Sequence, residues 1–148
     1  MPLQGVLMDF SSINIIDIGL ATVAGFITGA LWFSPKTFFP LWWNLMGKTE
    51  SDEPGAGQSM GTIFCALVGG QIVQALALTG AITGFYENAS VLQGASTGAL
   101  LGIGIAASSS LTHRMFSGLG KNAWSIWAIE VGNDIVGLAI MGAIIAAV

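Results

Sequence analysis

Four long apolar blocks, separated by short stretches that hold most of the charge, constrain the fold of this chain more than any other feature. Charged residues make up 8% of the 148 residues and hydrophobic residues make up 53%, whereas about 25% of a typical soluble domain is charged. A water-soluble fold of this composition could not cover its apolar surface with polar groups. The sequence therefore predicts an all-α integral membrane protein that forms a single membrane domain.

The length of the apolar blocks predicts how many times the chain crosses the membrane. A helix needs about 20 apolar residues to cross a hydrocarbon core of about 30 Å. Four segments meet this requirement, and we predict a four-transmembrane-helix bundle with spans at about 13–33, 60–86, 91–113 and 123–148. The first basic residue is Lys36, so the first apolar segment lacks the basic start of a cleaved leader and we expect it to be retained.

The inner loop at 34–59 is the longest connection between the predicted spans. Its first half carries large apolar side chains at near-helical spacing, but Pro40 would remove a backbone hydrogen bond inside a helix. We therefore expect a short helix from Pro40 to Met46 in the plane of the membrane interface, acting as an aromatic anchor. Docking of a partner or a lipid headgroup is the alternative. The second half, 48–59, is charged and contains glycine, which predicts a mobile surface loop.

Basic residues predict the orientation of the chain, because Lys and Arg collect on the cytoplasmic side of a membrane. All four lie in the first and third connections: Lys36, Lys48, Arg114 and Lys121. We therefore expect both termini on the non-cytoplasmic side of a plasma or inner membrane. Tryptophan rings prefer the membrane interface, and five of them map to the same inner face as interfacial anchors: Trp32, Trp42, Trp43, Trp124 and Trp127.

Two parts of the chain carry distinctive residue patterns. The first part is the stretch from Gly29 to Pro35, a glycine, leucine, tryptophan, aromatic, serine, proline pattern, followed by Phe38, Phe39, Trp42 and Gly47. The second part comprises Phe116, Gly118, the segment 124–129 and the segment 141–145. Together they resemble a known family of small multi-span membrane proteins, domain of unknown function 1761, and the chain departs from the family pattern at Asn133 and Asp134. The resemblance implies a multi-span fold and brings no established reaction, substrate or cofactor.

Small residues recur at helical spacing in the predicted spans. The chain has 21 glycines, and pairs or triplets spaced by four lie in the first three spans: Gly25 and Gly29, Gly80 and Gly84, then Gly94, Gly98 and Gly102. Such spacing places small residues on one helix face, where two backbones can approach closely. The pattern predicts glycine-rich packing within the bundle, and surplus stripes favour either a homo-oligomer or association with other membrane-protein subunits.

Polar residues inside the predicted spans are the candidate functional site. Ionisable groups are expensive at such depth, and each one calls for a physical reason. The predicted intramembrane polar cluster comprises Glu130, Asp134 and Asn133 on the fourth span with Gln71 and Gln74 on the second. Arg114 and Lys121, near the inner boundary, are possible charge partners for Glu130. Asp134 is one helical turn from Glu130 and shares its face.

This predicted cluster supports two functional hypotheses. In the first, Glu130 pairs with a basic residue, Asp134 is protonated or bonded to an amide, and the network locks the helices together. In the second, the two acids line a path for protons or cations. We expect the first, a structural or accessory component that self-associates or joins a larger membrane complex. A small proton- or cation-coupled transporter or channel is the alternative.

The sequence argues against several other classes of protein. His113 has no second ligand at metal-site spacing, and Cys65 lies in an apolar run that disfavours its thiolate. We therefore expect no enzymatic activity, no metal and no cofactor. A net charge of -4 with four basic residues argues against nucleic acid as a partner, which leaves the lipid bilayer and other membrane proteins.

Overall fold

The computed structural model describes residues 13–148, and this part of the chain is helical without any strand. The helices are α1 (Ile15–Trp32), α2 (Phe39–Leu45), α3 (Met60–Phe85), α4 (Val91–Leu101), α5 (Ser108–Met115) and α6 (Asn122–Ile145), and a π-helical segment, η2 (Gly102–Ala107), joins α4 to α5. Four helical stretches are long and apolar enough to cross a membrane: 15–32, 60–85, 91–115 and 122–145. The predicted all-α fold with four candidate spans is confirmed.

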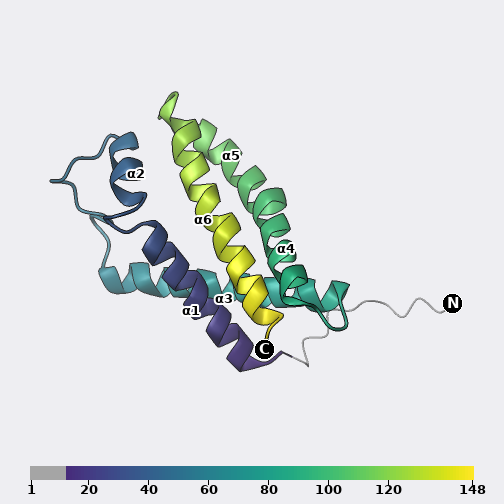
Figure 1. Ribbon diagram of the computed structural model, residues 1–148. Helices are drawn as coiled ribbons and strands as arrows, with labels where there is room; N and C mark the ends of the chain where they lie inside the picture. The colour runs from purple at the N-terminus through teal and green to yellow at the C-terminus, as the bar shows by residue number, and fades with distance from the viewer. Residues whose placement is uncertain (1–12) are drawn as a thin grey trace.

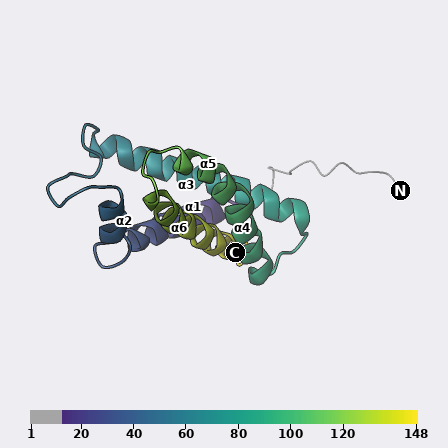
Figure 2. The ribbon, with the colours of Figure 1, turned by 90° about the horizontal axis from the view of Figure 1, so that it is seen from above.

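The helices form two layers (Figure 1). In the first layer, α6 lies between α1 on one side and the continuous α4, η2 and α5 on the other, and it packs against both neighbours. Helix α3 forms the second layer and crosses behind α1 and α6 at a steep angle. Figure 2 shows the same relation from above, with α3 running along one side of the other helices. Much of the surface of α3 is therefore left without a neighbouring helix.

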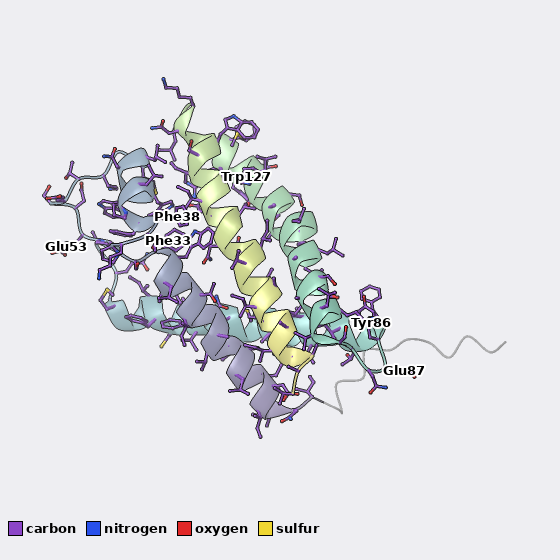
Figure 3. All side chains as sticks on the ribbon, viewed as in Figure 1. Phe33, Phe38, Glu53, Tyr86, Glu87 and Trp127 are labelled. Carbon is purple, nitrogen blue, oxygen red and sulfur yellow. The ribbon has the colours of Figure 1, made fainter. Side chains whose placement is uncertain are left out.

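The chain connections gather at two opposite ends of this arrangement. Helix α2 and the connection between α5 and α6 lie at one end, whereas the start of α1 and the end of α6 lie at the other (Figure 1). Figure 3 shows Phe38 and Trp127 at the first end and Tyr86 with Glu87 near the second. Arg114 and Lys121 flank the α5–α6 connection, so their positive charges share the end occupied by α2.

Side chains next to the helix ends explain where several helices begin. Asn14 accepts a hydrogen bond from the backbone N–H of Ile16 at 3.0 Å, and Ser59 accepts one from Thr62 at 3.1 Å. At the start of α4, Ser90 and Gln93 bond each other's backbone in a capping box. Each cap satisfies an N–H group that has no partner within the helix. These short polar residues therefore fix the points at which apolar helices start.

Helix α2 runs from Phe39 to Leu45, one residue earlier than the expected range of Pro40 to Met46. Pro40 occupies its first turn, where a missing backbone N–H costs nothing. The turn before it is built by Thr37, whose hydroxyl donates to the carbonyls at the end of α1 at 2.6 Å. Ser34 belongs to this turn, and α2 starts without a side-chain cap.

The bundle has one apolar core and one interface made by glycine. The core lies where α1, α3 and α6 meet, and its buried members are Ile18, Ala21, Ala75, Leu78, Ile82, Leu138 and Met141. Between α4 and α6, a Cβ atom added at Gly94 or Gly98 would collide with the α6 backbone, at Gly142 and Leu138 respectively. Only glycine allows the two backbones to approach this closely. Helix α6 therefore packs against α1 and α3 through the core and against α4 through glycine.

Candidate functional site

Two charged residues of the candidate spans and one tryptophan of α2 form an ion-pair cluster at the end of the bundle that carries α2. Arg114 donates from Nε to Oε2 of Glu130 at 3.0 Å, and its terminal nitrogen forms a salt bridge with Oε1. The indole of Trp42 donates to the same Oε1 at 3.0 Å. Both charged side chains are 24% exposed. Trp42, Arg114 and Glu130 are called the ion-pair cluster below. The pair of Arg114 and Glu130 is the one salt bridge within residues 13–148.

Each member of the ion-pair cluster comes from a different helix. Arg114 lies in the last turn of α5, where the negative end of the helix dipole favours a positive charge. Glu130 lies two turns into α6, and Trp42 is on α2. A two-point contact between a guanidinium and a carboxylate is among the strongest and most directional pairs in proteins. The cluster therefore fixes α2, α5 and α6 relative to one another.

Three further contacts surround the ion-pair cluster. The indole of Trp32 donates to the carbonyl of Ile129 at 3.0 Å and connects α1 to α6. Asn122 donates to the carbonyl of Leu45 at 3.2 Å and connects α6 to α2. The indole of Trp127 donates to the carbonyl of Ala107 at 3.1 Å. All three bonds satisfy backbone carbonyls at one end of the bundle.

The five tryptophans differ in what their indole groups contact. Trp43 donates to the carbonyl of Thr49 in the long connection at 2.9 Å. Trp124 is exposed and stands edge-on to Trp127, with ring centroids 6.1 Å apart. Trp32, Trp42 and Trp127 bond to groups inside the bundle, as described above. Four of the five indole N–H groups are therefore bonded to protein, and the fifth lies on an exposed ring.

The amides of the predicted cluster do not meet the ion-pair cluster. Gln71 of α3 and Asn133 of α6 both line a cavity of about 320 Å³ beside α1. The side-chain oxygens of both residues are buried, and neither has a hydrogen-bond partner among the described residues. Gln74 is on the exposed side of α3. Of the two glutamines, only Gln71 lines the cavity.

Asp134 is a neighbour of one member of each polar region, Asn133 and Glu130. It is half-buried, its carboxylate lies beside the side chain of Asn133, and Glu130 is its acidic neighbour on the same helix. No cation of residues 13–148 forms an ion pair with it. Lys121, the second candidate partner for Glu130, is exposed at the start of α6 and forms no salt bridge with the described residues. Of the two candidate cations, only Arg114 reaches Glu130.

Two participants in this region were missed by sequence analysis. Trp42 was expected to contact only the interface, yet it bonds Glu130 across 88 positions of sequence, and nothing in the local pattern shows this. The π-helical segment 102–107 was also missed. Its end places the Ala107 carbonyl within reach of Trp127, and π-helical turns often accompany functional sites. The closely spaced Gly102 and Gly104 were the available signal.

The long connection contains a second polar feature, outside the spans. Asp52 accepts hydrogen bonds from the backbone N–H and the hydroxyl of Thr49, both at 2.8 Å. These bonds favour the charged carboxylate, and they hold the pKa of Asp52 below its usual range, with a smaller contribution from the charge of Lys48. The segment also borders an open cavity of about 600 Å³ beside α2. The connection is therefore locally ordered around Thr49.

The four apolar helices are those of a membrane-embedded, multi-span protein, and its polar features include the ion-pair cluster and the amide-lined cavity. Comparison with protein families places the chain more narrowly. It belongs to the family described as Protein of unknown function (DUF1761), whose model matches residues 16–146. No curated protein and no solved structure matches the chain. The family resemblance drawn from the first span and the last span is thereby confirmed.

Proposed function

We propose that this protein is a non-catalytic structural or accessory component of membranes, which associates with a second copy of itself through the uncovered face of α3. Joining a larger complex through the same face is the related possibility. The observation that carries the proposal is Gln74, an amide side chain that lies near the middle of an apolar helix and is exposed to the surroundings of the bundle.

The face of α3 that bears Gln74 is uncovered over much of its length. From Met60 to Gly70, Ile63 is the one residue that is not exposed. Ala66, Gly70 and Gln74 are spaced by four and therefore share one side of the helix. A Cβ atom added at Gly70 would meet nothing within 4 Å. Small residues next to a polar one would let a second helix approach closely at this point.

An amide facing hydrocarbon favours a partner that can hydrogen-bond to it. An unpaired amide is costly in an apolar medium, and glutamine side chains stabilise contacts between membrane helices by about 0.6–2 kcal/mol. In a symmetric dimer the same residue of each copy can meet across the two-fold axis. Each Gln74 then supplies both a donor and an acceptor to its counterpart. A symmetric dimer is the simplest arrangement that gives the Gln74 amide hydrogen-bond partners.

The ion-pair cluster supports a structural role for Glu130 and Arg114. Both oxygens of Glu130 are occupied by Arg114, and one of them also by Trp42. A carboxylate that carries ions or protons must exchange its partners, and breaking a pair of this kind exposes an uncompensated charge. The contacts instead bind together three helices. Helix locking therefore accounts for Glu130 better than conduction does.

Asp134 favours the alternative, a small proton- or cation-coupled transporter or channel. It is half-buried without an ion-pair partner in the described part of the chain, and Glu130 lies one turn away. Acids in such positions in membrane proteins often take part in proton or ion movement. In that hypothesis Asp134 would bind and release the proton, and the nearby charge of Glu130 would change how tightly Asp134 holds it.

Dilution of the protein in lipid tests the proposed association. Donor- and acceptor-labelled copies in vesicles should show energy transfer that falls as the lipid-to-protein ratio rises. Gln74→Leu should weaken the dimer about three- to thirtyfold, as expected for losing amide bonds between membrane helices, whereas Gln74→Asn should keep most of the affinity. Val23→Leu, on the exposed side of α1, is the matched control and should change nothing.

Two results would overturn the proposed self-association. One is a monomer at every lipid-to-protein ratio. The other is a dimer whose affinity is unchanged by Gln74→Leu. Recovery of a different membrane protein at a fixed ratio after crosslinking through residue 74 in native membranes would instead establish the accessory role within a larger complex.

A further inference from the structure

A lateral cavity between α1, α3 and α6 has features of a binding site that are independent of the proposed association. Its volume is about 320 Å³, within the range of small-molecule pockets. The walls are largely aromatic and aliphatic, and the polar groups are the amides of Gln71 and Asn133. Phe26 and Phe64 contribute rings whose centroids are 6.1 Å apart. The cavity thus combines an apolar wall with two polar groups on different helices.

Glycines of α1 place the two amides within reach of one ligand. A Cβ atom at Gly25 would collide with the Gln71 side chain, and one at Gly29 would lie 3.8 Å from Oδ1 of Asn133. The two glycines are four residues apart, so the two side chains lie against successive turns of α1. The oxygens of the two amides accept no hydrogen bond from each other or from any other described residue. A polar group placed at this wall of the cavity would have both amides as neighbours.

The two oxygens define the chemistry of the missing partner. Both are buried acceptors without a donor in the described residues, and leaving such atoms unpaired costs about 1–3 kcal/mol each. No charged side chain lines the cavity, so a charged ligand would enter without a counter-ion. A neutral molecule whose hydroxyl groups donate to the two oxygens satisfies the site.

The position of the mouth indicates where such a molecule comes from. Phe64 and Leu67 line the cavity and are 48% and 51% exposed, and Ala30 is exposed on the facing side of α1. All three belong to segments that are apolar enough to lie in the membrane. The cavity therefore opens sideways, toward lipid, between α1 and α3. A ligand can enter from the bilayer with its apolar body still in contact with lipid.

We propose that this cavity binds the polar end of a neutral, hydroxyl-bearing lipid. The hydroxyl groups donate to Gln71 and Asn133, and the apolar body packs against Phe26 and Phe64 and extends into the bilayer. Two classes of lipid offer this chemistry. A glycerolipid that lacks a charged headgroup and has two free hydroxyl groups can donate to both oxygens, whereas a ring-shaped lipid alcohol with one hydroxyl group donates to one of them. The site goes beyond the proposed function, since Gln71 lines the cavity and Gln74 does not.

Photolabelling of the full-length protein in lipid nanodiscs tests this inference. The probe is a monoacylglycerol with a photoreactive diazirine in its chain, and the matched control is the methyl ester of the same chain, which has no hydroxyl. The monoacylglycerol should label cavity residues such as Phe64 or Leu67 more strongly than the ester does. Competition with unlabelled monoacylglycerol or with a sterol then distinguishes the two sources.

Variants at the base and at the mouth of the cavity separate binding from folding. Gln71→Leu and Asn133→Leu should each weaken labelling about two- to tenfold, the effect of one hydrogen bond, and circular dichroism checks that each variant is folded. Ala30→Phe should block the mouth and abolish labelling. Val23→Phe, on the same helix but outside the cavity, should leave it unchanged.

Three outcomes would overturn the inference. Equal labelling by the monoacylglycerol and its methyl ester would show that hydroxyl groups are not recognised. Labelling that survives Ala30→Phe would place the probe elsewhere on the surface. Unchanged labelling in folded Gln71→Leu and Asn133→Leu proteins would show that the two amides do not hold the ligand.

Discussion

At the scale of single residues, the ion-pair cluster shows how a charged group is accommodated among apolar helices. Glu130 would be costly alone, but Arg114 and Trp42 occupy its oxygens. Removing one partner of such a pair leaves the other charge uncompensated, which destabilises a protein more than the pair itself stabilises it. The side chains keep about a quarter of their exposure, so the cost is smaller than for a fully buried pair.

Substituting the pair separately and together measures this interaction. Arg114→Met and Glu130→Gln should each lower the free energy of unfolding in detergent by about 1–3 kcal/mol, with a coupling energy of about 0.5–3 kcal/mol in the double variant. Lys121→Met, which removes an exposed charge of the same sign, should change it by less than about 0.5 kcal/mol. Additive effects of the two substitutions would contradict a direct pair.

A second residue-level prediction concerns Asp52. Because the pKa of the folded state is lowered by the bonds from Thr49, this carboxylate stabilises the local turn above its unfolded pKa. The stabilisation is lost as the pH falls through the lower folded value. Titration by NMR should find the Asp52 carboxyl half-protonated at a lower pH than that of an unfolded peptide, about 3.9. A Thr49→Val variant should move it toward that value, and an unchanged titration would argue against these bonds.

At the scale of helices, packing depends on glycine at a few defined points. The α4–α6 contact needs glycine at 94 and 98, because a Cβ atom there would collide with the backbone of the other helix. Backbone cannot move aside as a flexible side chain can, so larger residues must separate the helices. Glycine elsewhere has a different role. Gly137 lies on α6 with nothing within 4 Å of an added Cβ atom.

This contrast gives a paired test of the helix interface. Gly98→Ala should destabilise the fold by about 1–3 kcal/mol through overpacking. Gly137→Ala should be neutral or raise stability by up to about 1 kcal/mol, because alanine is the better helix former. Thermal unfolding in detergent, followed by circular dichroism, compares the two. Equal effects at both positions would show that α4 and α6 are not in close backbone contact.

Helix positions followed from the sequence because apolar length and capping residues are local signals. The interface between α4 and α6 also has a local signal, the spacing of Gly94, Gly98 and Gly102. The contacts of the candidate site do not. Which of two cations reaches Glu130, and whether Gln71 or Gln74 faces inward, depends on the steep crossing of α3, which no short-range pattern encodes. The π-helical segment likewise depends on packing against α6.

At the scale of the whole molecule, the distribution of charge predicts how the bundle is oriented across the membrane. The basic residues flanking the α5–α6 connection share one end with α2, and Glu87 lies near the opposite end. Positive residues favour the cytoplasmic side. In a Cys65→Ser background, a cysteine at position 48 should therefore react with an impermeant thiol reagent only after the membrane is opened. A cysteine at position 87 should react in intact cells, and the reverse pattern would contradict this orientation.

Proton movement across reconstituted vesicles distinguishes the structural account from transport. The measurement compares wild-type protein with Asp134→Asn, recording the decay of an imposed pH gradient and the dimer fraction in the same vesicles. A structural component predicts a decay no faster than in protein-free vesicles for both proteins. Faster decay with wild-type protein, abolished by Asp134→Asn while folding and association stay intact, would contradict it and make Asp134 the residue that carries the proton.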